Sequence, residues 1–362
     1  MSRKITELFK TYTLLFCIIV LAFASIQFTD DIKVAASVSI KNCLTLIIPS
    51  MYGFMIIACF VLKSNLHTIM GKPFNLIAKY LFRISSDEFS IFLISIFSGY
   101  PVGVKIIYEL ESNGLISKKR AENLSCYCYS SGPAFIVGTV ATKLYRSIEV
   151  GMIIFLSIII SNIITGIVIA LLTKERIYDS NKKNPKLNLG MDTFVNSVQT
   201  AAKSLFEVCI MVLMFSIFYT IIFKFGIITF IAENISRLFN INTDTSQQIV
   251  ASFFEISNIS FFKQNNYLNL PVITGLLSFG GICVIIQIIA ISRGKVNIKK
   301  FLLARIFSSI NAAIICKVLT NYIFKNIAIN TFYDAQVKST EYSIIPSLAL
   351  LLMTIILLLK ND

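Results

Sequence analysis

A proline between two glycines interrupts one of the apolar stretches of this chain. Gly99-Tyr100-Pro101-Val102-Gly103 is followed closely by Lys105. Proline lacks an amide hydrogen and crowds the preceding turn, so we expect the helix to unwind here and to restart near Val102. The restarted helix would present free N–H groups and the positive end of its dipole beside a lysine. Such an arrangement favours a negatively charged ligand.

A second interruption follows in the same half of the sequence. Ser130-Ser131-Gly132-Pro133 offers two hydroxyls, a flexible glycine and a proline suited to the first turn of a helix. Helix breaks survive in hydrocarbon only when they are buried in protein or line a wet cavity. Paired interruptions therefore indicate the binding site of a transporter. The alternative is helix packing, because Gly99-xxx-Gly103 is also a small-xxx-small contact motif.

Glu255 and Lys105 are the ionisable residues that we expect deepest in the membrane. A charge at the bilayer centre costs about 3 kcal/mol, so each should face a cavity or a partner. Lys105 either faces an anionic solute or snorkels to the interface, and the sequence favours neither. Glu255, beside Ser257 and Asn258, is a candidate site for a proton or another coupling ion. Its alternative is a structural ion pair or helix cap.

Weaker candidates lie in later apolar runs. Gly280-Gly281 permits close backbone approach, and Gln287 offers a polar group within the same run. Glu207 and Arg305 lie nearer the ends of their runs, so we expect both at the interface. The candidate substrate-binding residues are therefore Gly99, Tyr100, Pro101, Gly103, Lys105, Ser130, Ser131, Gly132, Glu255, Ser257, Asn258, Gly280, Gly281 and Gln287.

Metal and enzyme chemistry have little support in the sequence. The single histidine, His67, has no partner, and Cys126-x-Cys128 lacks metal-ligand spacing, so we expect reduced structural thiols, no metal and no cofactor. The chain has no H-E-x-x-H motif, no G-x-S-x-G motif and no paired aspartates within apolar runs. We therefore do not expect an enzyme.

The elements that position these residues are membrane spans. The chain is 56% hydrophobic and 14% charged, with a mean hydropathy of +0.76, and its apolar residues form runs long enough to cross a bilayer. The clear runs are Tyr12–Phe28, Cys43–Leu62, Ile148–Leu172, Leu205–Phe223, Val272–Ser292, Phe301–Phe324 and Ser343–Leu359, and the weaker ones are Phe89–Tyr108, Cys126–Tyr145 and Gln248–Phe262. The net charge of +14 lies mainly in the connections, which indicates lipid headgroups and not nucleic acid.

The basic connections leave the topology open. Placing the N-terminus and every basic loop in the cytoplasm would require one segment in each half to enter and leave on the same side. The alternative is that one basic loop faces outward. Either arrangement agrees with the glycine and proline interruptions in both halves.

The motifs resemble those of a known family. The two first-half signatures, Gly99 to Lys105 and Ser130 to Gly138, and the later Glu255-Ile256-Ser257-Asn258 and Ser278 to Gln287, are similar to motifs of the YlbJ family of sporulation membrane proteins. The match is patchy but in order over roughly residues 40–325. It departs at Ser130, where the family usually has asparagine, and at Ile286, where histidine is common.

The resemblance implies a fold and a division of the chain. The family belongs to the nucleoside-recognition gate group, distantly similar to concentrative nucleoside transporters. It implies an all-α membrane protein, a polytopic helical bundle with two repeats that contain broken or re-entrant helices. The expected parts are N-terminal spans (1–62), an interfacial amphipathic helix (63–88), a first gate-like repeat (89–173), a basic linker (174–204), a second gate-like repeat (205–324) and a C-terminal span (325–362).

The resemblance also implies a function. In spore formers it implies transport of dipicolinic acid, an aromatic dicarboxylate, from the mother cell into the forespore. We therefore expect a multi-pass protein of the cell membrane, with the outer forespore membrane as a candidate location. Its partners would be membrane lipids, a small anionic solute and a coupling ion, H⁺ or Na⁺, and a homo-oligomer stays open. The alternatives are a nucleoside transporter and a membrane scaffold for spore maturation that moves nothing.

Overall fold

The computed structural model describes residues 2–173, 187–262 and 269–324, and this part of the chain is helical, without strands. In the first half the helices are α1 (Ser2–Gln27), α2 (Thr29–Asn42), the π-helical turn η1 (Cys43–Ile47), α3 (Ile48–Lys63), α4 (His67–Gly71), η2 (Lys72–Phe74), α5 (Asn75–Ile77), η3 (Ala78–Phe82), α6 (Ser86–Ser98), α7 (Val102–Ser112), α8 (Lys118–Ser125), α9 (Pro133–Phe135), η4 (Ile136–Tyr145) and α10 (Ile148–Thr173). In the second half they are α11 (Met191–Lys224), α12 (Ile227–Phe239), α13 (Thr243–Phe254), η5 (Ile256–Phe261), α14 (Leu270–Phe279), α15 (Gly281–Ile291) and α16 (Ile298–Phe324).

The helical bundle expected from composition is confirmed. Five helices in the described residues are long and apolar enough to cross a membrane: Thr29–Lys63, Ile148–Thr173, Met191–Lys224, Leu270–Ile291 and Ile298–Ile323. The predicted run Cys43–Leu62 belongs to a longer helix that begins at Thr29. The predicted span Ser343–Leu359 and most of the basic linker, residues 174–186, lie outside the described residues. Within the linker prediction 174–204, α11 already begins at Met191.

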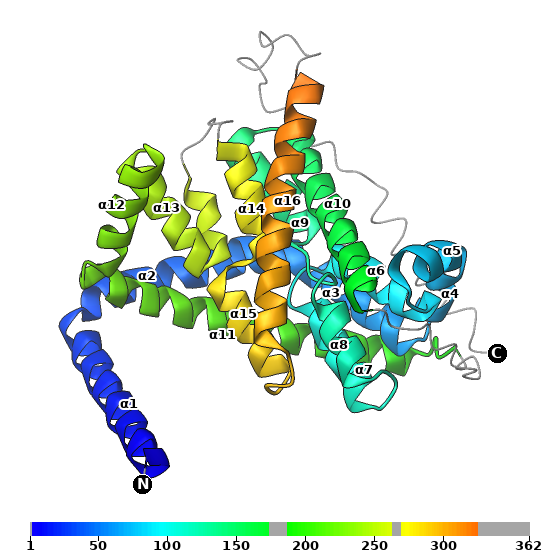
Figure 1. The fold of residues 1–362 in the computed structure, drawn as a ribbon, viewed down its shortest axis with the longest axis horizontal. Coiled ribbons are helices and arrows are strands. Elements are labelled where there is room, and N and C mark those ends of the chain that lie inside the picture. Colours follow the sequence, from blue (N-terminus) through cyan, green and yellow to red (C-terminus); the bar gives the residue numbers. More distant parts are fainter. Residues whose placement is uncertain (1, 174–186, 263–268, 325–362) are drawn as a thin grey trace.

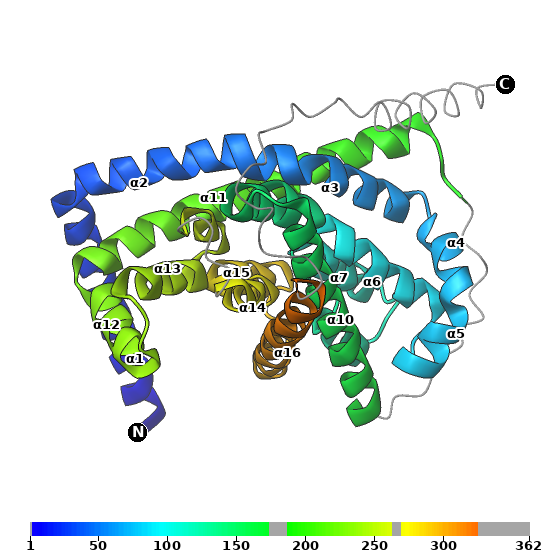
Figure 2. The same ribbon diagram turned by 90° about the horizontal axis from the view of Figure 1, so that it is seen from above.

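Two long helices form one side of the molecule. The continuous helix α2–η1–α3 packs along α11, and the two run across the view in Figure 1 and along one edge in Figure 2. Lys63 at the end of α3 donates hydrogen bonds to the Asn196 carbonyl and the Thr200 hydroxyl of α11, at 2.9 and 2.6 Å. This pair provides a wall against which the interrupted helices pack.

A second pair of helices closes the other side. α10 and α16 pack against each other, and α14 packs on both (Figure 2). Small polar side chains meet where they cross: the Ser161 hydroxyl donates to the Ser308 carbonyl at 2.6 Å, and the Ser308 hydroxyl donates to Asn162 Oδ1 at 3.1 Å. Interhelical hydrogen bonds of this kind hold helices together in lipid, where apolar packing gives no selectivity.

The interrupted helices lie between these two layers. α6 ends at Ser98 and α7 begins at Val102, as the glycines and proline predict. α8 ends at Ser125 and a helix resumes at Pro133, in the first-turn position expected of a proline. In the second half α13 ends before Glu255, and Gly280, at φ 88°, separates α14 from α15. In both halves, therefore, a long helix is followed by short helices, two interrupted segments and a second long helix.

The interfacial helix predicted over 63–88 is not one regular helix. From His67 to Phe82 the chain passes through α4, η2, α5 and η3, with Pro73 in the 3₁₀ turn. Of the apolar side chains expected on one face, Ala78 and Phe82 are buried, whereas Phe74, Ile77 and Leu81 are exposed. The irregular path follows from the proline, which cannot donate a helical hydrogen bond.

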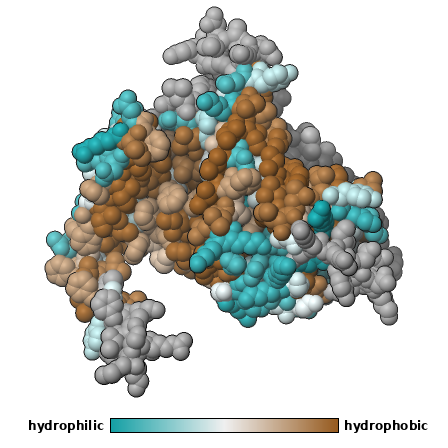
Figure 3. Space-filling model, in the orientation of Figure 1, coloured by the Kyte–Doolittle hydropathy of each residue, from teal (hydrophilic) through white to brown (hydrophobic). Residues whose placement is uncertain are grey.

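Basic residues gather at one end of the bundle. Arg120 pairs with Glu88 at 3.1 Å, Lys295 with Glu111 at 2.6 Å, and Lys300 donates to Asn123 Oδ1. These contacts place the start of α6, the end of α7 and the starts of α8 and α16 together. Figure 3 shows this region as a hydrophilic patch below a broad apolar band. We call this end the basic face. The band and its polar edges are those of a protein that spans a bilayer.

Candidate functional site

The two breaks of the first half touch through backbone. A Cβ added to Gly99 would lie 3.2 Å from the Gly132 nitrogen and 3.1 Å from the Met51 methyl group. Gly99 also has φ 74°, a conformation that residues with a Cβ rarely adopt. Pro101 follows a cis peptide bond and caps the start of α7. Both signatures predicted from sequence thus form one joint.

The two breaks of the second half form an equivalent joint. A Cβ added to Gly281, at φ 82°, would lie 3.4 Å from the Ile256 nitrogen and from the carbonyl oxygens of Ser252 and Phe253. The sequence indicated close approach at Gly280-Gly281, and the structure shows that the partner is the segment around Glu255. Each half therefore brings its two interruptions together.

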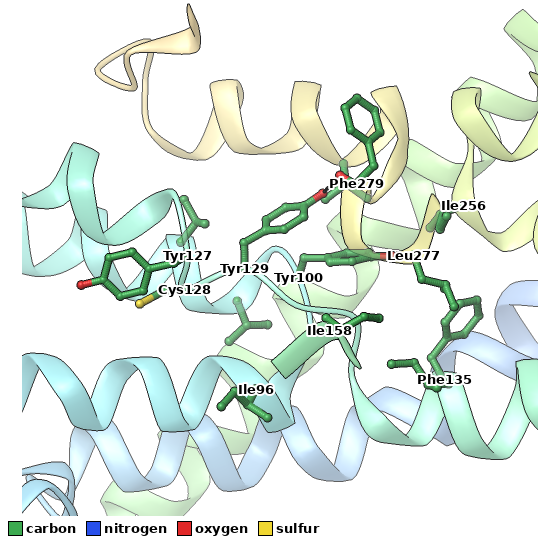
Figure 4. Close-up of a cluster of buried hydrophobic side chains, with 14 of the residues drawn as sticks. Ile96, Tyr100, Tyr127, Cys128, Tyr129, Phe135, Ile158, Ile256, Leu277 and Phe279 are labelled. Atoms are coloured by element: carbon green, nitrogen blue, oxygen red, sulfur yellow. Dashed lines mark hydrogen bonds between the residues drawn. The ribbon is translucent and has the colours of Figure 1, made fainter. Parts of the chain in front are cut away.

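Tyrosines join the two joints across the halves. The Tyr129 hydroxyl donates to the Phe279 carbonyl at 3.0 Å, and a Cβ on Gly280 would overlap that hydroxyl. The Tyr129 ring stacks on Tyr100 with centroids 4.9 Å apart and an interplanar angle of 23°. Figure 4 shows Tyr100 between Tyr129 and Leu277, with Phe135 and Ile256 on the far side. The sequence singled out Tyr100 and missed Tyr129.

A cavity of about 40 Å³ lies where the four breaks converge. It is lined by Ile47, Met51, Tyr100, Ser131, Gly132, Phe135, Val208, Val212, Glu255, Ile256, Ser257, Val284 and Gln287. The Tyr100 hydroxyl, the Ser131 hydroxyl and Gln287 Oε1 are buried without a hydrogen-bond partner among the described residues. Tyr100 and Ser131 are neighbours, but their hydroxyls lack hydrogen-bond geometry. Buried polar atoms are normally paired, so these three indicate a site for a polar guest.

Glu255 is the carboxylate of this central cavity and is 3% exposed. Its Oε2 accepts hydrogen bonds from the Ser257 backbone N–H, at 2.9 Å, and from the Ser257 hydroxyl. Asn258 points elsewhere, because its amide donates to the Ala251 carbonyl at 3.1 Å and closes the end of α13. Glu255 thus both caps the turn that follows it and lines the central cavity.

A larger hollow shares part of its wall with the central cavity and is lined by Glu111 and Lys295 of the basic face. This vestibule has a volume of about 530 Å³, and Val208 and Gln287 line both spaces. Lys105 lies in the vestibule and not in the central cavity: its Nζ donates to the Ser204 hydroxyl at 2.7 Å and is 3.8 Å from a Glu207 carboxylate oxygen. The side chain of Glu207 is 50% exposed, but α11 begins at Met191, so Glu207 lies near the middle of this helix and not near its end.

The interfacial position expected for Arg305 is wrong. Its side chain is completely buried, and its guanidinium donates to the Tyr129 carbonyl at 3.3 Å, to Asn162 Oδ1 at 3.5 Å and to the Cys126 carbonyl. It also lies 4.8 Å from the centre of the Tyr129 ring. The cause is the non-helical segment 126–132, whose carbonyls lost their helical donors and need others.

The predicted site residues therefore divide into three groups. The central cavity gathers Tyr100, Ser131, Gly132, Glu255, Ser257 and Gln287, whereas Pro101 and Lys105 line the vestibule, which Gln287 also reaches. Backbone joints and local bonds occupy Gly99, Gly103, Ser130, Asn258, Gly280 and Gly281. The residues that sequence reasoning missed are Tyr129, Asn162 and Arg305. One signal was present: Ser308 and Ser309 follow Arg305 by one helical turn, which marks a polar face inside an apolar run.

Metal chemistry finds no donor set in the described residues. No group of three or more histidine, cysteine or acidic side chains gathers there, and the seven cysteines described are all free thiols.

Comparison with known proteins identifies one relative. The chain is 22% identical over 304 residues to the sporulation integral membrane protein YlbJ of Bacillus subtilis (strain 168), covering 75% of this chain and 74% of that protein. This similarity supports the resemblance drawn from the motifs: the chain is similar to YlbJ, and the relative and the apolar helices together support a multi-pass membrane protein. No family model matches the sequence, and no solved structure matches it.

Proposed function

We propose that this protein is a secondary transporter of a small anionic solute that acts in sporulation, with dipicolinic acid as the named candidate, and that it is not an enzyme. The observation that carries the proposal is the central cavity, where breaks from both halves converge and three buried polar atoms have no partner in the part of the chain that the structure describes. Helix breaks that meet at a buried cavity inside the membrane are typical of transporters.

The cavity offers suitable contacts for a carboxylate on an aromatic ring. The hydroxyls of Tyr100 and Ser131 can donate to a carboxylate oxygen, and the Tyr100 ring can lie against the ring of the solute. The cavity of about 40 Å³ has room for water-sized molecules only, so the joints must separate for the solute to enter. The shared wall at Gln287 then provides the route from the vestibule.

Glu255 supplies a mechanism for coupling. Two hydrogen bonds go to Oε2, which leaves Oε1 able to carry a proton. An ionised Glu255 would repel an anionic solute, whereas the protonated group would donate to it. Solute and proton would therefore bind together, and H⁺ is the coupling ion that we propose, with Na⁺ as the alternative to exclude.

The vestibule gives the proposed carrier a direction. It opens beside the basic face, which positive residues would hold on the cytoplasmic side. Lys105 there meets anions before they reach the central cavity. The ion pair between Arg120 and Glu88 brings the start of α8 to the start of α6. We propose that α6–α7 is accordingly a re-entrant hairpin, a segment that enters and leaves the membrane on the same side. Such a segment in the first half is what the cytoplasmic placement of every basic loop requires. We also propose that the two similarly ordered halves are the implied repeats.

Uptake into proteoliposomes tests the function. Purified protein should accumulate radiolabelled dipicolinate when an inward proton gradient is imposed, and unlabelled dipicolinate should compete. Accumulation that follows a Na⁺ gradient alone would mean that Na⁺, and not H⁺, is the coupling ion. Competition by uridine or adenosine in place of dipicolinate would favour a nucleoside carrier. No accumulation under any gradient would remove dipicolinate as the candidate.

Two substitutions separate a carrier from a scaffold. Glu255→Gln should lower uptake by about tenfold or more, because hydrogen bonds to charged groups are worth about 1.5–3 kcal/mol. Lys105→Met should raise the KM for the anion about fivefold, as expected for a charge that is only partly buried and worth about 1 kcal/mol. Lys33→Met, at an exposed lysine of α2, is the matched control. A scaffold would tolerate all three in a sporulation assay, and unchanged spore yield with both site variants would reject the carrier.

A further inference from the structure

We propose that Arg305 is a positioning residue for the central cavity: from α16, in the second half, it holds the non-helical segment 126–132 of the first half and, through Tyr129, orients Tyr100. The hold on the segment is independent of what the protein transports. The effect on the solute rests on the proposed function.

The first step is the backbone of the segment. α8 ends at Ser125, and beyond it the carbonyls of Cys126 and Tyr129 accept no backbone hydrogen bond from the described residues. The guanidinium donates to two carbonyls of this stretch, those of Cys126 and Tyr129, and Asn162 Nδ2 donates to the Tyr129 carbonyl as well, at 3.0 Å. The fork of an arginine reaches two acceptors at fixed separation, whereas the single ammonium of a lysine does not.

The second step is the ring of Tyr129. The guanidinium carbon lies 4.8 Å from its centroid, and the opposite contact of that ring is the stacked Tyr100. Phe301, one turn before Arg305 on α16, packs edge-on against Tyr129 at 5.5 Å. Tyr129 is therefore fixed on several sides, and its position determines where the unpartnered hydroxyl of Tyr100 points.

The third step is the charge. Arg305 forms no ion pair with a carboxylate in the described part of the chain, and its Nε has no partner there. A buried cation held by carbonyl dipoles and aromatic rings, with no carboxylate beside it, is rare inside a membrane and marks a functional position. The charge of Arg305, separated from the cavity by the stacked rings of Tyr129 and Tyr100, contributes a positive potential there. This potential favours an anion over a neutral solute of the same shape.

Two native cysteines report on the segment directly. Cys126 and Cys128 are fully buried in it, whereas Cys59 on α3 and Cys316 further along α16 serve as internal references. In Arg305→Met, alkylation of Cys126 and Cys128 by N-ethylmaleimide, mapped by mass spectrometry, should accelerate about tenfold relative to Cys59. Arg305→Lys should give a smaller increase, and the exposed Arg237→Met on α12 none.

Transport kinetics separate positioning from simple loss of folded protein. Arg305→Met should raise the KM for dipicolinate, with a smaller effect on the maximal rate per folded carrier, and Arg305→Lys should restore part of the affinity. If Arg305→Met yields no folded protein, Asn162→Ala removes a second donor from the same Tyr129 carbonyl and should also speed alkylation of Cys128. Unchanged alkylation in Arg305→Lys and Asn162→Ala would overturn the inference, whether or not the protein transports dipicolinate.

Discussion

The two joints satisfy the hydrogen bonds of their interrupted helices in different ways. The first-half joint leaves residues 126–132 non-helical and obtains its donors from helices far along the chain, through Arg305 and Asn162. The second-half joint is compact: Glu255 caps its own turn through Ser257, and two glycines of positive φ carry the chain through the bend. The first joint therefore depends on the packing of the whole bundle, whereas the second depends on local geometry.

This difference predicts which contacts a substitution in each joint will weaken. A change in the first joint should loosen contacts between α8, α10 and α16, because these helices share its hydrogen bonds. A change in the second joint should act on the bend itself and on the cavity beside it. The variants below test this contrast.

Gly280→Ala should have the largest effect. The new methyl group would overlap the Tyr129 hydroxyl at a φ of 88°, so the free energy of unfolding should fall by about 3 kcal/mol. Thermal unfolding of the purified protein in detergent measures this. Gly114→Ala, at φ 70° with open space around it, controls for the backbone strain alone. Adding Tyr129→Phe should recover part of the loss, and no recovery would mean that the overlap is not its cause.

Asn162→Ala should have the next largest effect. It removes a donor to the Tyr129 carbonyl and an acceptor from Arg305 and Ser308, which leaves buried polar groups unpaired at a cost of about 2 kcal/mol. The same thermal measurement applies, and Asn234→Ala on exposed α12 is the control. Equal stability of the two variants would show that the first joint does not depend on α10.

Tyr129→Phe should cost about 1 kcal/mol, because it removes one hydrogen bond to the Phe279 carbonyl and keeps the ring that stacks on Tyr100. Tyr322→Phe, at an exposed tyrosine of α16, should change nothing. Since this bond joins the two halves, uptake should change more than thermal stability does. A variant with normal uptake would remove this bond from the working parts of the carrier.

Ser257→Ala should have the smallest effect on stability, well under about 1 kcal/mol, because the backbone N–H of residue 257 still donates to Glu255. With the hydroxyl gone, Glu255 should accept a proton more readily, since a bond to the charged form is lost. The pH at which uptake is half-maximal should accordingly rise. An unchanged pH profile would argue against Glu255 as the proton carrier.

The positions of the helix breaks follow from residues at the breaks themselves, whereas the side chains that stabilise the breaks come from distant parts of the sequence. Pro101 and Pro133 made both first-half interruptions predictable, since proline removes a donor wherever it stands. The burial of Arg305 was not predictable, because an apolar run does not reveal how far its helix is set into the bundle or what its polar face meets. Lys105 shows the same limit: its partners Ser204 and Glu207 lie in the other half of the chain.

The basic face is bridged between the halves by Lys295 with Glu111 and by Lys300 with Asn123, beside the mouth of the vestibule. Any cycle that parts the halves on this side must open both bridges at each turnover. Because the Lys295 side chain is 40% exposed, added electrolyte weakens the first bridge. In the proposed carrier, salt on this side of the membrane should therefore shift the resting conformation, whereas salt on the opposite side should leave it unchanged.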